Sequence, residues 1–216
     1  MRRDRSIDDG ETTLRLLGRR RGPPELLQIG YVRAVSVEVV PYSPEWPAQF
    51  ERVAADLRAA LEDLPTAAAV EHVGSTSVPG LAAKPVLDID VIVAQGEVGA
   101  AVAALVAAGY VHRGDLGVAG REAFSAPDED PRRHVYVCRA GTLHLRNHLA
   151  VRDVLRRRPD LRDEYAAVKL ALAGDPAIDI DTYVARKSPI LQKVLAEAEL
   201  TDEERRAILR LNDPSV

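Results

Sequence analysis

Residues 72–93, HVGSTSVPGLAAKPVLDIDVIV, form the stretch that decides the fold. A glycine–serine turn, Gly74-Ser75, precedes an apolar run that contains two aspartates, Asp88 and Asp90. Successive side chains of a strand point to opposite faces of its sheet, so the two aspartates share one face and the apolar residues share the other. Neighbouring carboxylates repel each other unless a cation neutralises them. The pattern therefore predicts a half-buried strand whose polar face binds a divalent cation.

Hydrophobic periodicity on both sides of this stretch predicts further strands and helices. Strands are expected over residues 35–40, 67–73, 86–93, 110–113, 121–125 and 134–139. Helices are expected over residues 45–64, 98–108, 143–157, 160–172, 180–198 and 202–211. This order predicts an α+β fold, in which helices pack on one side of a mixed sheet and a helical region follows at the C-terminus.

Composition and charge narrow the class of protein. The 216 residues include 33 acidic and 29 basic side chains, and this near balance does not indicate general nucleic-acid binding. The single cysteine, Cys138, cannot form an internal disulfide and is compatible with a reducing, cytoplasmic location. No apolar run reaches the roughly 20 residues that span a bilayer, so we expect no membrane partner.

The chain divides into three expected regions. Residues 1–35 are rich in arginine and are expected to form a flexible basic arm, more typical of a solvated tail than of an RNA-binding segment. Residues 36–198 are expected to form the folded domain. Residues 199–216 are expected to form a helical tail.

The Gly74-Ser75 turn has features of a phosphate-binding site. Glycine lets the backbone approach a ligand closely, and exposed amides with a hydroxyl donate hydrogen bonds to phosphate oxygens. Mg²⁺ is typically held by one or two carboxylates together with substrate phosphates. The short interval to Asp88 therefore predicts phosphates and Mg²⁺ side by side, although an ordinary turn and a solvent-exposed strand face are the simpler alternatives.

These residues resemble a known signature. Gly74-Ser75 followed by Asp88-Ile89-Asp90 is similar to the pattern of the polymerase-beta-like nucleotidyltransferase superfamily. Within it, residues 36–198 resemble the GrpB family, some of whose members are fused to dephospho-CoA kinase. The segments that carry the likeness are residues 41–46, 72–85 and 152–156, together with Pro159, Tyr165, Lys169, Tyr183 and Lys187.

The resemblance implies a nucleotidyltransferase-like fold and an activity. A Mg²⁺-dependent enzyme would transfer a nucleoside monophosphate from a nucleoside triphosphate, most simply ATP, to an acceptor and release pyrophosphate. The acceptor is left open, with a small molecule favoured over RNA or protein; a carboxylate acceptor would give ligase-like chemistry. Asp88 and Asp90 would hold the metal, and the expected nucleotide-binding residues are Gly74, Ser75, Lys84, Arg152, Lys169 and Lys187.

One departure from the superfamily pattern concerns the third acidic residue. The strand expected to carry it presents His134, Tyr136 and Cys138 on its polar side, with no carboxylate. His134 could act as the general base, because its ordinary pKa lies near neutrality, or could make a structural hydrogen bond. Glu122 is a spare acid on a neighbouring strand. The alternative function is a non-catalytic nucleotide-binding or assembly module with a degenerate site.

Two further features have competing interpretations. His144 and His148 lie four residues apart, as zinc-binding pairs do, but no acid or cysteine accompanies them at ligand spacing, so we predict no zinc site there. Arg152 could face the nucleotide or form a local ion pair with Asp153. The sequence leaves the base preference and the oligomeric state open.

Overall fold

The computed structural model describes residues 38–175 and 177–212. The basic arm expected over residues 1–35 lies outside the described residues, as does the end of the expected tail from residue 213. No helix among the described residues is long and apolar enough to cross a membrane.

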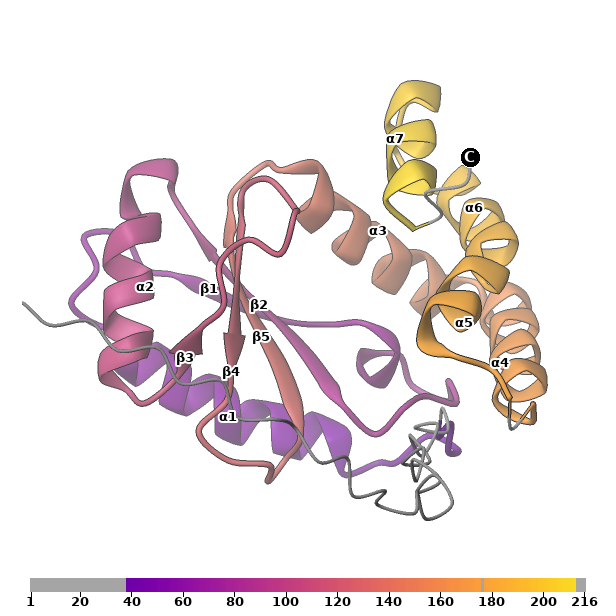
Figure 1. The fold of residues 1–216 in the computed structure, drawn as a ribbon, viewed down its shortest axis with the longest axis horizontal. Helices are drawn as coiled ribbons and strands as arrows, with labels where there is room; N and C mark the ends of the chain where they lie inside the picture. The colour runs from indigo at the N-terminus through magenta and orange to yellow at the C-terminus, as the bar shows by residue number, and fades with distance from the viewer. Residues whose placement is uncertain (1–37, 176, 213–216) are drawn as a thin grey trace, which may run out of the picture. The chain divides into compact units, whose positions relative to one another are not determined.

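A five-stranded mixed sheet occupies the centre of the described part (Figure 1). Its strands are β1 (Ala69–Val73), β2 (Leu87–Val93), β3 (Val111–His112), β4 (Arg121–Ser125) and β5 (Arg133–Arg139), arranged in the order β1-β2-β5-β4-β3. Strand β2 runs antiparallel to β1 and parallel to β5. This arrangement confirms the predicted α+β class and the mixed sheet.

One face of the sheet is apolar and is covered by the helices α1 (Trp46–Ala60) and α2 (Val98–Ala107). The main core joins Phe50 and Leu57 of α1 and Leu105 of α2 to Ile89 of β2 and Val137 of β5. Because side chains alternate along β2, burial of Ile89 in this core fixes Asp88 and Asp90 on the opposite face. The hydrophobic core therefore sets the orientation of the two carboxylates.

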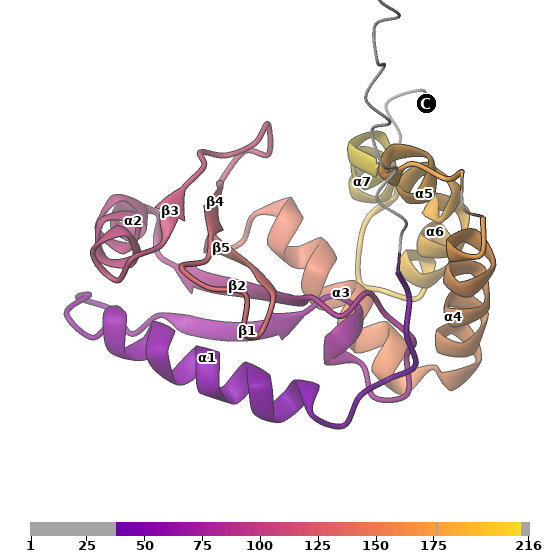
Figure 2. The same cartoon turned by 60° about the horizontal axis from the view of Figure 1, so that its bottom comes forward.

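Five further helices form the C-terminal region of the described chain, from the centre to the right of Figure 2. They are α3 (Leu143–Arg157), α4 (Pro159–Ala173), α5 (Ile180–Arg186), α6 (Ser188–Ala196) and α7 (Asp202–Asn212). Val78 and Leu81, just after the glycine–serine turn, are buried against Leu155 of α3, Tyr165 of α4 and Leu191 of α6. This second core fixes the helical region to the turn.

Two predicted elements differ from the structure in more than their end residues. Val40 forms only an isolated bridge with Ala83, so the described part of the predicted strand over 35–40 is not a sheet strand; Pro41, which lacks an N–H donor, follows it. The helix predicted over 180–198 is two helices, α5 and α6, that break at Lys187. Pro189 fits the first turn of the second helix but cannot continue the first.

Candidate active site

The glycine–serine turn lies directly against the first aspartate. Gly74 has a φ of +69°, and a Cβ atom there would lie 2.2 Å from Oδ2 of Asp88. Val73, the last residue of β1, also pairs with Asp88 across the sheet. Only glycine provides both this backbone conformation and this close approach. The expected juxtaposition of turn and carboxylate is therefore present.

Strand β5 places a histidine beside Asp88. The register sets Asp88 opposite His134, and His134 Nδ1 lies 3.0 Å from Asp88 Oδ1. Burial alone raises the pKa of Asp88, but the hydrogen bond and charge of His134, with smaller contributions from His148 and Lys187, bring the net pKa below its ordinary value. Asp88 is therefore ionised, and the His134 side chain, 54% exposed, remains accessible.

Asp90 lies deeper than Asp88 and is fully buried. Its Oδ2 is 2.9 Å from Nδ1 of His148 on α3, while its Oδ1 has no hydrogen-bond partner among the described residues. Burial lowers the pKa of His148, but the hydrogen bond and charge of Asp90 reverse the effect, and the net pKa is raised. An unpaired buried carboxylate oxygen is rare and marks a position where a cation would be stabilised.

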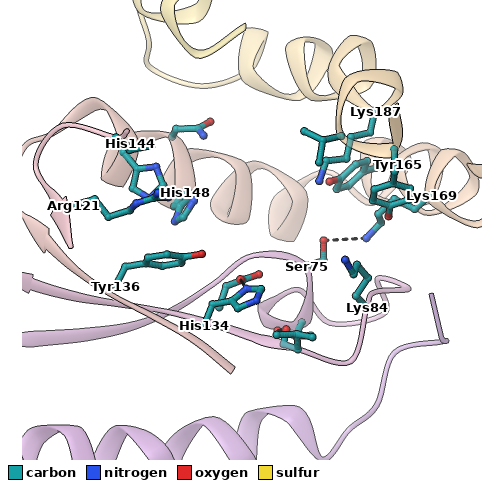
Figure 3. A pocket seen from close by; sticks show the side chains of 17 residues that line it. Ser75, Lys84, Arg121, His134, Tyr136, His144, His148, Tyr165, Lys169 and Lys187 are labelled. Carbon is teal, nitrogen blue, oxygen red and sulfur yellow. Dashed lines mark hydrogen bonds and ion pairs between the residues drawn. The ribbon is translucent and has the colours of Figure 1, made fainter. Parts of the chain in front are cut away.

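A cavity of about 460 Å³ opens beside Asp88 (Figure 3). Its volume falls within the range of about 300–1,000 Å³ that is typical of small-molecule sites. The polar side chains that line it include Ser75, Lys84, Asp88, Arg121, His134, Asn147, Lys169 and Lys187. The structure thus brings the turn, one aspartate, the histidine and three of the predicted cations to one space.

Lys169 of α4 makes the closest link between the helical region and the turn. Its Nζ donates to Ser75 Oγ at 3.0 Å and also to the carbonyl oxygen of Ala82, and lies 4.5 Å from the centre of the Tyr165 ring. Burial, with repulsion from Lys187, lowers the pKa of Lys169 to about 7. Lys169 is therefore a buried cation whose charge is only partly maintained at neutral pH.

Lys84 and Lys187 complete the group of lysines. Burial lowers the pKa of both, and the charge of Lys187 adds to the effect on Lys84, while Asp88 opposes it in each case. Among the described residues, none of the three lysines forms an ion pair with a carboxylate. This positive and incompletely neutralised wall is suited to a polyanion such as a triphosphate.

Arg152 lies elsewhere. Its guanidinium forms ion pairs with Glu71 at 2.6 Å and Asp153 at 2.7 Å, and donates to the His72 carbonyl oxygen. It lines a separate cavity, together with Arg156. The predicted role of Arg152 in nucleotide binding is therefore not supported by its position, whereas the alternative local ion pair with Asp153 is present.

No carboxylate of β5 joins the two aspartates. Tyr136, expected on the polar side of its strand, lies opposite Asp90 in the register. Burial, with the charges of Asp88 and Asp90, raises the Tyr136 pKa to about 12. Glu122 pairs with Val137 in the register, which assigns it to the other face of the sheet, and it contacts His112 at 2.7 Å. Glu122 is therefore not a substitute for the third acid.

The prediction of no zinc site at His144 and His148 assumed that no acid accompanies the two histidines, and the structure contradicts this premise. Asp90 supplies the missing acid, because potential ligand atoms of Asp90, His144 and His148 all lie within 4.8 Å of one another. Burial, with repulsion from His148 and Arg121, lowers the pKa of His144 to about 3, so this imidazole is neutral. The four-residue spacing was the only signal in the sequence, since the acid lies 58 residues before His148.

Comparisons with known proteins agree with this fold. The chain is 37% identical over 168 residues to the UPF0157 protein BH1888 of Halalkalibacterium halodurans, covering 77% of this chain and 84% of that protein. It is 32% identical to a dephospho-CoA kinase of Mycolicibacterium paratuberculosis over 71% of this chain, which matches only 44% of that protein. The crystal structure of the conserved protein GrpB from Enterococcus faecalis is 33% identical, with a TM-score of 0.64 over 74% of this chain and 98% of that one. Residues 36–197 match the family model described as GrpB protein, and the chain belongs to the GrpB family.

Proposed function

We propose that this protein is a Mg²⁺-dependent nucleotidyltransferase. It transfers a nucleoside monophosphate from a nucleoside triphosphate, with ATP the expected substrate, to an acceptor and releases pyrophosphate. The observation that carries the proposal is the contact of the Gly74 turn with Asp88 at the edge of a cavity that three lysines line. Phosphoryl and nucleotidyl transfer depend on positioning and charge neutralisation, which this arrangement supplies.

The two aspartates fit the metal that the resemblance implies. Asp88 is ionised at the cavity wall, and Asp90 has a buried oxygen without a hydrogen-bond partner among the described residues. Carboxylate oxygens are preferred Mg²⁺ ligands, so Asp88 and Asp90 would hold the ion. When bound, Mg²⁺ would neutralise the triphosphate and the charge that develops on its leaving group.

The other cavity residues bind and orient the triphosphate. The turn at Gly74 leaves room for phosphate oxygens, and Ser75 with Lys169 donates hydrogen bonds to them. Lys84 and Lys187 neutralise the remaining negative charge. The α-phosphate would then lie in the part of the cavity that His134 lines.

His134 is the proposed general base. Because ionised Asp88 accepts a hydrogen bond from Nδ1, the neutral ring keeps its lone pair on Nε2. That nitrogen takes the proton of an acceptor hydroxyl as the new O–P bond forms and the bond to pyrophosphate breaks. A carboxylate acceptor needs no such proton transfer, and the product would be an activated acyl phosphate ester. We expect a small-molecule acceptor of one of these two kinds.

A non-catalytic nucleotide-binding module is the second candidate. It is favoured by the polar face of β5, which places His134 and Tyr136 opposite Asp88 and Asp90 and provides no third carboxylate. Such a module would bind Mg²⁺ and nucleotide in the same cavity without turnover.

Thermal unfolding tests the site first. A ligand that binds only the folded state raises its stability by RT ln(1 + [L]/Kd). We expect stabilisation by Mg²⁺ with a nucleoside triphosphate, weaker stabilisation by either alone, and none by adenosine. Asp88→Asn should abolish the Mg²⁺-dependent part, whereas Asp163→Asn, an exposed acid paired with Arg162 on α4, should retain it.

Pyrophosphate release then separates an enzyme from a binding module. We expect release from the triphosphate in the presence of Mg²⁺ and a panel of small carboxylates and alcohols, and a loss of about 1,000-fold in Asp88→Asn because metal neutralisation contributes several kcal/mol to the transition state. Binding without release across the panel would favour the module. Absence of Mg²⁺-dependent binding would contradict both candidates.

A further inference from the structure

We propose that Asp90, His144 and His148 form a binding site for a divalent first-row transition-metal ion. The two histidines lie on α3, near Arg121 and apart from the lysines that line the same cavity (Figure 3). This site shares Asp90 with the proposed Mg²⁺ site, but it needs no nucleotide.

The geometry of the three side chains is close to that of a metal site. His144 and His148 are one helical turn apart on α3, and their ring centres are separated by 4.0 Å. Asp90 approaches from β2, with 2.9 Å between its Oδ2 and His148 Nδ1. Zinc bonds of about 2.0–2.1 Å place tetrahedral ligand atoms about 3.3 Å apart. Small side-chain rotations would therefore bring the ligand atoms from within 4.8 Å to bonding positions.

Two buried atoms of this cluster lack partners. Among the described residues, His144 Nε2 and Asp90 Oδ1 are buried without a hydrogen bond. Buried side-chain nitrogen and oxygen atoms nearly always have a hydrogen-bond partner. One nitrogen and one oxygen without partners in the same small cluster therefore need an explanation. An ion coordinated by the imidazole and the carboxylate would satisfy this requirement.

The donor set selects the class of ion. Two imidazoles with one carboxylate suit zinc, iron, cobalt or manganese, whereas Mg²⁺ and Ca²⁺ prefer oxygen ligands alone. Three protein ligands leave a coordination position open, and both histidines line the cavity, so a ligand there could reach the ion. The residue opposite Asp90 in β5 is Tyr136, so the imidazole ligands come from α3 and not from β5.

Arg121 is the nearby charge that acts against the cation. Its guanidinium carbon lies 4.8 Å from the centre of the Tyr136 ring, and it also lines the cavity. Its repulsion reduces the affinity for a bare ion. The same guanidinium attracts an anionic group, which could occupy the open coordination position.

Cobalt binding to the untagged full chain tests the site without nucleotide. After removal of metals with a chelator, Co²⁺ is titrated while its visible absorption is followed. We expect one Co²⁺ to bind per chain, with the visible absorption of a protein-bound ion. Zn²⁺ should displace this Co²⁺ and excess Mg²⁺ should not, because imidazole ligands favour transition metals over Mg²⁺. A chain that binds no Co²⁺, or that loses it to Mg²⁺, would overturn the proposal.

Variants then assign the ligands. His144→Ala should weaken Co²⁺ binding by at least about 100-fold. Removing a residue that only supports a metal ligand costs up to about 100-fold in affinity, so removing a ligand itself should cost at least as much. His144→Phe retains a ring without a ligating nitrogen and should show the same loss if the alanine variant does not fold. His112→Ala, which removes a histidine paired with Glu122, should bind as the original chain does. Unchanged affinity in a folded His144 variant would contradict the assignment, and this result is independent of whether Mg²⁺ and nucleotide bind.

Discussion

Two groups of basic side chains contact the segment around the glycine–serine turn, and they differ in what surrounds their charges. On the cavity side, Lys169 donates to Ser75 and lies near Lys187, and neither has a carboxylate ion-pair partner among the described residues. On the other side, Arg152 pairs with Glu71 and Asp153. The lysines are held near one another without neutralisation, whereas this arginine is already neutralised.

This difference separates a binding role from a structural one. Burial of a cation without an anionic partner has a desolvation penalty, which the attraction of an incoming anion can offset. An arginine with two carboxylates makes its contacts in the absence of any ligand. Arg156 has a comparable structural role, since it donates two hydrogen bonds to the carbonyl oxygen of Ser77. We therefore expect substitutions in the two groups to have different consequences.

Gly74→Ala gives the largest expected effect, because it acts on the point at which the turn meets Asp88. The new Cβ would lie 2.2 Å from Oδ2 of Asp88. The alanine would also have to adopt a φ of 69° with a ψ of −172°, a combination found almost only at glycine. We expect the affinity for Mg²⁺ and nucleotide to fall by about 100-fold or more, or about 3 kcal/mol. Isothermal titration calorimetry measures this loss.

The matched control for this substitution is Gly114→Ala. Gly114 has a φ of +75°, but a Cβ atom there would have no neighbour within 4 Å. The control also places an alanine at a positive φ, at a cost of about 1–2 kcal/mol of unfolding free energy, without the contact. Equal losses of nucleotide affinity in both variants would show that strain, and not the space beside Asp88, is responsible.

Lys169→Met has the next largest expected effect. It removes a cation that points at Ser75 and should weaken triphosphate binding by about 10- to 100-fold, the worth of a hydrogen bond to a charged group. The matched control is Lys193→Met, because Lys193 is an exposed lysine of α6 paired with Glu164. An equal triphosphate affinity in the two variants would show that Lys169 does not bind the triphosphate.

The pH dependence of stability provides a separate test of Lys169. Its folded-state pKa of about 7 lies below the ordinary value of 10.5, so the unfolded chain binds more protons between these pH values. The free energy of unfolding should therefore rise with pH in this window, by at most about 1.4 kcal/mol per pH unit from this group. Denaturant titrations at several pH values measure the slope, and Lys169→Met should lack this contribution.

Arg152→Met has the smallest expected effect on binding. The affinity for nucleotide should change by less than about twofold, while the free energy of unfolding should fall by about 1 kcal/mol because partly exposed ion pairs contribute little. Calorimetry and denaturant titration measure the two quantities. A loss of nucleotide affinity as large as that of Lys169→Met would show that Arg152 takes part in nucleotide binding and would contradict the difference between the two groups.

Local patterns in the sequence predicted one half of the site. Alternation placed Asp88 and Asp90 on the same face, and the short interval after Gly74-Ser75 kept the turn close to them. Both inferences depend on strand geometry and chain length, which short stretches of sequence encode. The family resemblance added Lys169 and Lys187, which the cavity includes, and Arg152, which it does not.

The remaining half depends on contacts between segments that are distant in the sequence. The parallel pairing of β2 with β5 sets His134 beside Asp88, and packing of α3 over the sheet brings His148 to Asp90. Two histidines one turn apart on a helix give no indication of an acid 58 residues before the second of them. The break between α5 and α6 positions Lys187, and the helical periodicity of residues 180–198 did not reveal it.

A crystal structure with Mg²⁺ and a non-hydrolysable nucleoside triphosphate analogue would test the central claim most directly. The account predicts that phosphate oxygens lie within hydrogen-bond distance of Ser75 Oγ and Lys169 Nζ, with a metal ion bonded to Asp88. Phosphates bound beside Arg152 and Arg156, or outside the cavity altogether, would contradict it.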